Sequence, residues 1–551
     1  MPHNYESALD IVLSHITPVG TRRLAPLAAL GAVLAEDVAA PRPHPPFAAS
    51  IKDGYALNVA DGALDYAVVG ASRAGASDQP PLQPGEAAYI TTGAPLPPGA
   101  SAVVQVEDAV ALDASGQAAG GATPESTRIR LRAPPKPGQD LRPVGFDIAE
   151  GDVVLRKGAR VGAAEVGVLS TVGCAEVSVS AAARVAVLST GDELVDTLAA
   201  SSAGGAPPLR PSAIFDANRP TLLALSAEAR AETIDLGVAA DEPAALDAAL
   251  DAALAGGADI VICSGGVSMG DRDLVKPTLA RRGTVHFGKV LLKPGKPLTF
   301  ATVPRGTGAT GGSGGELGRG PLLVFGLPGN PVSAFVCFHL FVVPTLRAMA
   351  LEPSARPRRV VATLAGDVKL DPERPEFHRV VLSAKPHGLL AHSTGSQISS
   401  RLVSCVGADG LAEMPPASDW GAPTVAAGAR VTVLLIGDTA HGAGAPNDLL
   451  PSHLRPALPP PPPPSAPAAS GSPSAALAGT AGGSGGAEAP PEPIGVLTTG
   501  EGGDALTAAV RSALASGLAA ASWRAELRAL PGAPSADATA DALRGLCAAC
   551  G

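Results

Sequence analysis

The sequence has no long run of basic residues. Its 551 residues include 41 Lys and Arg against 51 Asp and Glu, which gives a net charge of −10. Proteins that bind nucleic acid or an anionic membrane surface ordinarily present a basic patch. We therefore expect neither as the main partner, and an anionic substrate would have to be held in a local pocket of cations.

Long apolar runs are also scarce, and no leader sequence is expected. No apolar run is long enough to cross a bilayer, which takes about 20 residues, so we expect no membrane span. The most apolar stretch, residues 333–343, is predicted to be a short buried helix. Residues 1–16 lack a basic start followed by a continuous apolar core, which argues against a signal peptide. These features favour the cytosol.

Cysteine is scarce, with six residues scattered along the chain. Four of them lie in apolar strand or helix patterns and are expected to be small buried hydrophobes. Cys547 and Cys550 form a single pair with no second pair and no histidine nearby. A zinc or redox site is therefore not expected there.

Glycine and proline gather in particular segments. Three Gly/Ala/Ser-rich stretches, at 111–126, 199–211 and 305–320, are predicted to be surface loop insertions. Residues 441–493 are predicted to be a linker and include six consecutive prolines at 459–464. Such a segment is stiff polyproline II followed by flexible chain, and a spacer is favoured over a docking site for an SH3-type domain.

The remaining sequence predicts several units. Apolar spacing indicates an amphipathic helix over 6–16 and a second helix around 27–34. Short strands separated by turns fill 45–147, and another helix is expected over 163–171. From residue 184 strands and helices alternate, which implies a parallel sheet with helices on both faces. The expected strands are 185–188, 232–236 and 259–263, with helices at 220–230 and 243–254.

The predicted fold class is therefore a multidomain α/β protein. After the linker, the run Ile-Gly-Val-Leu-Thr-Thr-Gly-Glu at 494–501 is similar to Val-Ala-Val-Leu-Ser-Thr-Gly-Asp at 185–192. The last segment therefore looks like the start of a second copy of the parallel-sheet domain, but it is too short to complete that domain. The predicted units are a discontinuous N-terminal α/β domain (1–45 and 148–182), a small β-rich domain (46–147), a parallel-sheet α/β domain (183–350), a C-terminal β domain (355–440), the linker (441–493) and the partial copy (494–551).

Two short turns predict an anion site. The run Lys-Pro-Gly-Lys-Pro at 293–297, which we call the lysine turn, follows a further Lys289 and the apolar run 290–292, which is predicted to be a strand. The run Gly-Leu-Pro-Gly-Asn-Pro at 326–331, the proline turn, precedes the apolar segment 333–349, which is predicted to be a helix with its N-terminus beside the turn. Lysines beside a helix N-terminus attract an anion. Either turn alone could be an ordinary loop turn whose lysines are solvated. The two turns together, in this order, favour an anion site.

Acidic and glycine residues follow the predicted parallel strands. Glu193, Asp241 and Asp273 each come soon after a strand, and Ser264, Gly265 and Gly266 follow the third. In open α/β sheets ligands bind at the carboxyl ends of strands. Glycine allows close backbone approach, and nearby carboxylates suit a divalent cation with a phosphate.

Seven motifs, in order, resemble one family. They are Ser-Ile-Lys-Asp-Gly-Tyr-Ala (50–56), Ile-Thr-Thr-Gly-Ala-Pro (90–95), Gly-Phe-Asp-Ile (145–148), Leu-Ser-Thr-Gly-Asp-Glu-Leu (188–194), Ser-Gly-Gly-Val-Ser-Met-Gly (264–270), the lysine turn, and the proline turn with its following Val-Ser. This order is similar to that of molybdopterin molybdenumtransferases, the MoeA proteins of bacteria and the E domains of gephyrin and its plant counterparts. The resemblance covers roughly residues 5–440 and is closest to plant and algal forms.

The resemblance implies the last step of molybdenum cofactor synthesis, in which adenylylated molybdopterin releases AMP while molybdate is inserted, with Mg²⁺ required. The central domain is then MogA-like and the N-terminal domain dimerises. Molybdate is a tetrahedral dianion, which cationic and hydroxyl side chains hold by charge-assisted hydrogen bonds. The residues expected for molybdate and the pterin phosphate are Ser264, Gly265, Gly266, Lys289, Lys293, Lys296, Pro297, Pro328, Pro331, Ser333, Arg379, Ser399 and Ser400.

The expected catalytic residues are acidic or hydroxylated and include the metal candidates Glu193, Asp241 and Asp273; the others are Asp53, Thr92 and Asp147 in the small β domain. In the family the cleft lies between the small β domain of one subunit and the parallel-sheet and C-terminal domains of the other, so a homodimer is expected. A separate G-domain adenylyltransferase is a possible partner.

Plainer roles stay open for several of these residues. Asp53 could be a turn aspartate, Asp147 could accept only backbone N–H groups, Glu193 could pair with a surface arginine, and His378 is expected to be packed or hydrogen-bonded. Two other functions also stay open: a gephyrin-like scaffold that binds partners, and a bifunctional protein whose tail is an adenylyltransferase. The incomplete segment 494–551 argues against the second.

Overall fold

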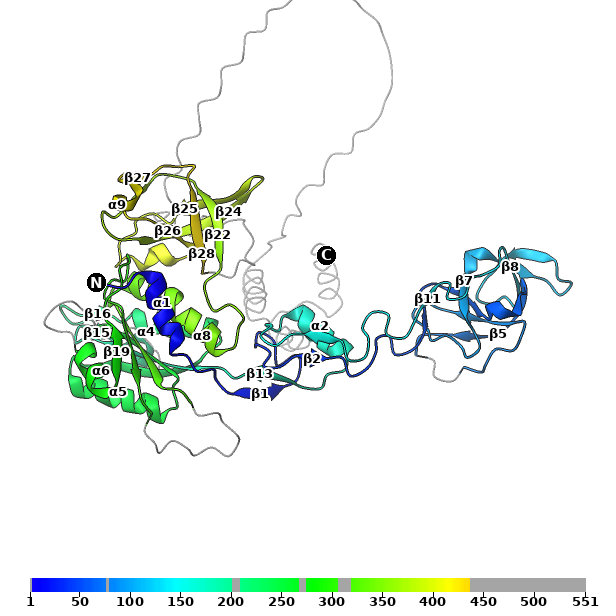
Figure 1. Ribbon diagram of the computed structural model, residues 1–551, viewed down its shortest axis with the longest axis horizontal. Helices are drawn as coiled ribbons and strands as arrows, with labels where there is room; N and C mark the ends of the chain where they lie inside the picture. The colour runs from blue at the N-terminus through cyan, green and yellow to red at the C-terminus, as the bar shows by residue number, and fades with distance from the viewer. Residues whose placement is uncertain (1, 76–78, 201–208, 267–273, 306–318, 437–551) are drawn as a thin grey trace, which may run out of the picture. The chain divides into compact units, whose positions relative to one another are not determined.

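The computed structural model describes residues 2–75, 79–200, 209–266, 274–305 and 319–436, and the account below concerns these residues. The predicted linker 441–493 and the partial copy 494–551 lie outside them, as do Asp273, Cys547 and Cys550. The multidomain α/β fold class is confirmed, with separate cores for an N-terminal unit, a β-rich unit and a C-terminal barrel. Figure 1 labels the elements.

The N-terminal unit is assembled from two distant stretches of chain. Its two small antiparallel sheets pair β1 (Thr21–Leu24) with β13 (Val177–Ser180) and β2 (Val38–Ala39) with β12 (Val153–Leu155). Helix α2 (Ala163–Thr171) covers them and has the predicted bounds. Its Leu169 joins a buried core with Leu34 and Val179.

The prediction of a helix around 27–34 is wrong. Residues 26–31 form turns, and Gly31 ends them at a φ of +81°. Val33 and Leu34 are then extended, and they bridge Arg160 and Val179. Pairing with neighbouring strands satisfies their backbone groups, so tertiary contacts override the helix-like apolar spacing.

The β-rich unit is built on a seven-stranded sheet in the order β7-β4-β6-β5-β10-β8-β9. Gly54 is required in it because a Cβ there would lie 2.0 Å from the Val104 carbonyl oxygen. Part of the insertion 111–126 is not a loop but forms a hairpin with an exposed outer strand. The strands are β4 (Gly54–Leu57), β5 (Asp65–Ser72), β6 (Glu86–Ile90), β7 (Ala102–Gln105), β8 (Ala109–Leu112), β9 (Ala118–Gly121) and β10 (Arg128–Leu131), beside a separate pair, β3 (Ala49–Ser50) and β11 (Leu141–Arg142).

The α/β unit is a six-stranded sheet in the order β17-β14-β18-β21-β20-β19. The first four strands are parallel, as predicted, while β20 runs antiparallel to both β21 and β19. Consequently β19 runs in the same direction as the parallel strands. The strands are β14 (Arg184–Thr190), β17 (Glu232–Ala239), β18 (Ile260–Ser264), β19 (Thr284–Phe287), β20 (Thr299–Val303) and β21 (Leu322–Leu327), with a small parallel pair, β15 (Leu194–Val195) and β16 (Ile214–Phe215).

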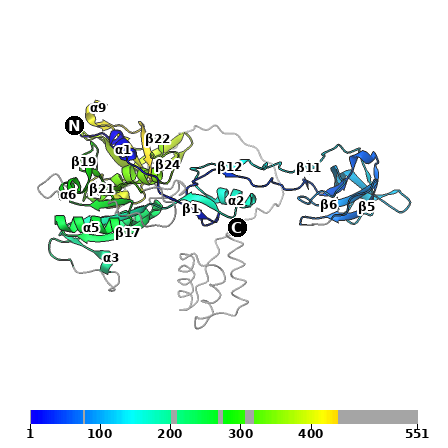
Figure 2. The same ribbon diagram turned by 60° about the horizontal axis from the view of Figure 1, so that its bottom comes forward.

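Helices cover both faces of this sheet (Figure 2). Alternate strand residues such as Val187 and Ile262 pack with α1, α4 and the α7–α8 helix, while Leu188 and Val261 pack with α5 and α6. The two faces therefore carry separate cores. The helices are α1 (Tyr5–Ser14), α4 (Asn218–Glu228), α5 (Pro243–Ala255), α6 (Val275–Arg282), α7 (Pro331–Cys337) and α8 (Val343–Met349), and a short α3 (Thr197–Ala200) follows β15.

The helix predicted over 333–349 is confirmed, and it begins two residues earlier, at Pro331. A π-helical turn over Phe338–Val342 joins α7 to α8, and this wider turn precedes Pro344, which has no N–H to continue an ordinary helix. The whole run Pro331–Met349 is long and apolar enough to cross a membrane, but 72% of it is buried inside the protein. It is a core helix.

The C-terminal unit is a closed five-stranded barrel in the order β22-β25-β24-β26-β28. Its residues Phe377, Leu411 and Leu434 belong to the same core as helix α1 and the sheet. The elements are β22 (Arg359–Leu364), β23 (Val368–Lys369), β24 (Glu376–Lys385), β25 (Gly388–Ser393), β26 (Gly410–Met414), α9 (Ala417–Trp420), β27 (Thr424–Val425) and β28 (Arg430–Leu435).

Candidate active site

The lysine turn lies in the loop 288–298 between β19 and β20. The strand expected at 290–292 is absent; Val290 makes only an isolated bridge to His3. Because β19 runs parallel to β14, β18 and β21, this loop nevertheless leaves the sheet at the carboxyl edge of those strands. The turn therefore lies at the predicted edge, although a different topology brings it there.

The insertion 305–320 connects β20 to β21 at the opposite edge of the sheet. Most of it is outside the described residues, but its ends are fixed. The Arg305 Nε donates to the Gly320 carbonyl oxygen at 2.9 Å, and the Arg319 Nη1 donates to the Gly257 carbonyl oxygen at 2.9 Å. Both ends of the insertion are thus held at the edge away from the lysine turn.

The lysine turn packs against α7, the helix that begins at the last residue of the proline turn. Gly295 has a φ of +117°, and a Cβ on it would lie 2.4 Å from the Sγ of Cys337 in α7. Pro331 begins α7, and Pro328 and Ser333 are buried beside it. The structure therefore brings together the two turns that the sequence predicted to form one site.

A third segment joins them from the barrel. We call residues 393–401 the serine loop. The Val332 N–H donates to the Ser399 carbonyl oxygen at 3.0 Å, and the Asn330 side-chain amide donates to the Ser399 hydroxyl at 3.1 Å. Ser399 thus lies at the N-terminus of α7, and the neighbouring Ser400 is exposed.

Arg379 is the most unusual cation of the site. Its side chain is wholly buried, and its Nη2 and Nε donate to the Ser404 hydroxyl at 2.9 and 3.3 Å. Its Nη1 has no hydrogen-bond partner among the described residues. Burial lowers the pKa of Arg379, and the Cys405 thiol and Glu376 carboxylate oppose this effect without cancelling it. A buried guanidinium with a free donor is suited to an anion, which reaches Nη1 only after the covering side chains move.

The two lysines of the turn differ in their partners. Lys293 Nζ lies 2.8 Å from Glu376 Oε2 and 3.6 Å from Asp371 Oδ2, while Lys296 makes no ion pair within the described chain. Burial disfavours ionised Glu376, but hydrogen bonds from His378 and Lys293 outweigh burial and lower its pKa. Burial also opposes ionisation of Asp371, and hydrogen bonds from Arg374 and two backbone N–H groups lower its pKa to about 2. Lys296 is therefore the freer charge.

His378 is packed and hydrogen-bonded, as the sequence predicted. Its Nδ1 lies 3.2 Å from Glu376 Oε1 and its Nε2 lies 2.8 Å from the Ser393 hydroxyl. Sequence reasoning missed Glu376, Asp371 and Ser404 as partners of the site cations. The only local signal was that Glu376 stands three residues before Arg379 in the chain, whereas Ser404 is 25 residues after it. Lys289 is exposed without such a partner in the described part.

The glycine turn at 264–266 is fitted closely to its neighbours. Gly265 has a φ of +94°, and a Cβ there would lie 2.4 Å from the Thr190 carbonyl oxygen. The side-chain amide of Asn218 donates to both the Ser264 hydroxyl and the Gly329 carbonyl oxygen at 2.7 Å. Asn218, which the sequence did not single out, thereby ties the glycine turn to the proline turn.

The acidic residues lie at the ends of β14 and β17. The Asp241 N–H donates to Asp192 Oδ1 at 3.3 Å, and Glu193 follows Asp192 directly. A cavity of about 10 Å³ is lined by Thr190, Asp241 and Gly266 among others, and the Thr190 hydroxyl is buried with no described partner. No group of three His, Cys, Asp or Glu residues in the described chain could hold a metal, and Asp273 is outside it. The plainer alternative for Glu193, a pair with a surface arginine, is not seen among the ion pairs of the described residues.

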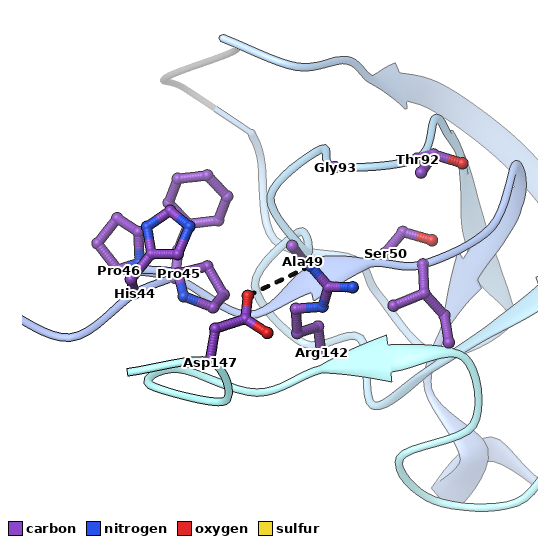
Figure 3. A pocket seen from close by; sticks show the side chains of 11 residues that line it. His44, Pro45, Pro46, Ala49, Ser50, Thr92, Gly93, Arg142 and Asp147 are labelled. Atoms are coloured by element: carbon purple, nitrogen blue, oxygen red, sulfur yellow. Dashed lines mark hydrogen bonds and ion pairs between the residues drawn. The ribbon is translucent and has the colours of Figure 1, made fainter. Parts of the chain in front are cut away.

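Two of the three candidates in the β-rich unit, Thr92 and Asp147, line a pocket (Figure 3), and Asp53 is hydrogen-bonded to Thr92. The Asp53 Oδ1 accepts from the Thr92 N–H at 2.6 Å and from the Thr92 hydroxyl at 3.0 Å. Asp147 Oδ2 lies 3.3 Å from Arg142 Nη1 rather than accepting only backbone N–H groups. Thr92, Asp147 and Arg142 line a cavity of about 300 Å³. Arg142 was missed, although it stands five residues before Asp147.

Comparison with known families covers most of the described chain. Residues 3–173 match the MoeA N-terminal region (domain I and II), residues 186–348 match a probable molybdopterin binding domain, and residues 361–436 match the MoeA C-terminal region (domain IV). The chain is 36% identical over 331 residues to a molybdopterin molybdenumtransferase from Haemophilus influenzae, covering 60% of this chain and 73% of that protein.

Two eukaryotic relatives are longer. The chain is 37% identical over 419 residues to gephyrin from Dictyostelium discoideum and 38% identical over 382 residues to the molybdenum cofactor synthesis protein cinnamon from Drosophila melanogaster. The matches cover 70% and 68% of this chain but only 56% and 58% of those proteins. A crystal structure of a molybdopterin biosynthesis MoeA protein from Pyrococcus horikosii superposes with a TM-score of 0.64 at 30% identity, covering 80% of this chain and 100% of that one.

Proposed function

Because this chain belongs to the MoeA family, a family of molybdenum cofactor biosynthesis, we propose that it is a molybdopterin molybdenumtransferase that inserts molybdate into adenylylated molybdopterin and releases AMP. The observation that carries this proposal is the meeting of the lysine turn, the proline turn and the serine loop at one sheet edge, beside a buried arginine with a free donor. Such a group of cations and hydroxyl groups suits a small tetrahedral dianion.

The chemistry of each site residue assigns it a role in binding molybdate or the pterin phosphate. Lys293, Lys296 and Arg379 supply positive charge. Ser399 and Ser333 supply neutral hydrogen bonds, so that molybdate is held by directed contacts. The Ser264 glycine turn lets backbone approach the terminal phosphate of the pterin, with Lys289 as its countercharge. Asp53, Thr92 and Asp147 contribute from the β-rich unit.

The carboxylates at the strand ends fit a magnesium ion. Mg²⁺ binds through one or two carboxylates together with substrate phosphates, and the Thr190 hydroxyl adds a buried oxygen without a described partner. Glu193 and Asp241 would hold the ion together with Asp273. When bound, Mg²⁺ neutralises the phosphoanhydride and stabilises the leaving AMP.

We also propose a cytosolic homodimer in which the β-rich unit of one subunit completes the site of the other. A separate G-domain adenylyltransferase would then supply the substrate. Analytical ultracentrifugation at assay concentration tests the dimer, and a fully active monomer would contradict it. The gephyrin relative keeps an additional scaffold role open for the same dimer.

The activity itself is tested by reconstitution with adenylylated molybdopterin, molybdate and Mg²⁺. AMP release is measured for the wild type and for Asp273→Asn, Lys293→Ala and Lys296→Ala. We expect molybdate-dependent AMP release by the wild type and losses in all three variants. Equal turnover by the wild type and the variants would refute the site assignment, and the absence of molybdate-dependent release by the wild type would refute the function.

A further inference from the structure

Lys293 is held by carboxylates of the barrel. Its ammonium lies 2.8 Å from Glu376, whose side chain is only 3% exposed, and 3.6 Å from Asp371. Asp371 has a second partner, because Arg374 Nη2 lies 2.8 Å from it. Glu376 is therefore the closer of the two carboxylate partners of Lys293, and it is not shared with Arg374.

Backbone contacts fix this pairing. The Lys293 N–H donates to the Pro375 carbonyl oxygen and the Phe377 N–H donates to the Lys293 carbonyl oxygen, both at 2.8 Å. Lys293 and Glu376 thus lie side by side as a parallel bridge between the lysine turn and the start of β24. The side-chain pair is not an accident of two long flexible groups meeting at a surface.

Glu376 also connects to the serine loop. Its second oxygen lies 3.2 Å from His378 Nδ1, and His378 Nε2 lies 2.8 Å from the hydroxyl of Ser393, the first residue of that loop. The Ser393 hydroxyl in turn accepts from the Gly395 N–H at 3.2 Å. A continuous chain of polar contacts therefore runs from the lysine turn to the loop that carries Ser399.

We propose that Glu376, supported by His378, is a positioning residue that holds the Lys293 ammonium in its place in the oxyanion site. A lysine ammonium has three donors; Glu376 occupies one at hydrogen-bonding distance, which leaves donors for an oxyanion. The inference rests on the proposed function, because it assigns Glu376 a role through a molybdate-binding lysine. The inference adds Glu376 and His378 as residues that position Lys293, and it does not add a residue that contacts molybdate.

The test is a double-mutant cycle in the full-length chain. Molybdate alone is titrated calorimetrically into the wild type, Glu376→Gln, Lys293→Ala and the double variant, and KM for molybdate and kcat for AMP release are measured for each. Glu376→Asp tests rescue by a shorter carboxylate, and thermal unfolding monitors folding. Glu373→Gln is the matched control, since this carboxylate is exposed in the same loop.

Loss of one charge-assisted hydrogen bond should weaken molybdate binding by Glu376→Gln roughly tenfold or more. KM should rise by a similar factor, Glu376→Asp should recover part of the loss, and Glu373→Gln should match the wild type. In the Lys293→Ala background, Glu376→Gln should cause no further loss of affinity. An equal loss in both backgrounds, or none in either, would overturn the positioning role.

Failure of the proposed function gives a different result. If the wild type binds no molybdate and releases no AMP, the function fails before Glu376 is tested. If the wild type binds molybdate and Glu376→Gln binds it equally well, the function stands and the positioning role is refuted. Should Glu376→Gln not fold, His378→Ala in the two Lys293 backgrounds provides the same comparison, with a severalfold loss expected only where Lys293 is present.

Discussion

Replacing Arg379 by methionine should weaken molybdate binding strongly while leaving the fold intact. The guanidinium is wholly buried, and no carboxylate of the described chain pairs with it. Methionine has a similar length and fills irregular core space. The substitution therefore removes a buried charge without opening a large cavity.

The expected stability change is small because opposing effects cancel. Two hydrogen bonds to Ser404 are lost, each contributing about 1.5–3 kcal/mol when a charged group is involved. Burying an ion, however, costs several kcal/mol even after relaxation. The Ser404 hydroxyl still donates to the Arg401 carbonyl oxygen at 2.7 Å, and the residue 379 N–H still donates to Gln397 Oε1, so no new unpaired donor is left. We expect the free energy of unfolding to change by less than about 2 kcal/mol.

The functional change should be large. One lost charge-assisted hydrogen bond to molybdate corresponds to about a 10- to 150-fold rise in the dissociation constant. Urea unfolding measures stability, and calorimetric titration with molybdate measures affinity. Arg430→Met, at an exposed position of the same barrel, is the control and should leave both unchanged. A destabilised Arg379→Met protein that binds molybdate normally would show that Arg379 is a structural residue and refute this reasoning.

Three further predictions follow from other parts of the fold. Asp371 has a folded-state pKa of about 2, below its ordinary value near 3.8. Its ionised form therefore stabilises the fold above about pH 4, and this contribution is lost as the pH falls toward 2. In urea titrations, the difference in free energy of unfolding between the wild type and Asp371→Asn should shrink over that pH window. Gly295→Ala should destabilise the protein by about 1–3 kcal/mol because of its positive φ and the crowding against Cys337, whereas Gly366→Ala, with open space around it, should not; equal unfolding midpoints would contradict this. Deleting residues 441–551 should leave AMP release unchanged, and a loss of turnover in the shortened protein would show that the tail contributes.

Much of the fold could be predicted because its signals are local. The strands at 185–188 and 260–263 are continuous apolar runs, which is typical of buried parallel strands. The strand at 232–236 alternates polar and apolar residues from Thr233 to Leu236, as a partly exposed strand does. The helix at 163–171 has its predicted bounds, and its start is fixed locally, because the Glu165 carboxylate accepts from the Gly162 N–H. These features depend on residues close together in sequence.

What could not be predicted depends on distant pairing. The run 290–292 has the composition of a strand, yet its Val290 pairs only with His3 at the other end of the chain. The antiparallel pairing of β20 and the bridge between Lys293 and Glu376 likewise join segments whose pairing no local sequence pattern predicts. The motifs identified Lys293 as a site cation, but the buried carboxylate that holds it became visible only in three dimensions.

The most direct test of the site is a crystal of the protein soaked in tungstate, a heavier tetrahedral dianion, with the anion located by its anomalous scattering. The account predicts a peak within hydrogen-bonding distance of Lys296 and Ser399, beside Arg379. A single strong peak elsewhere, such as beside Arg142 in the pocket of the β-rich unit, with none at the lysine turn, would contradict it.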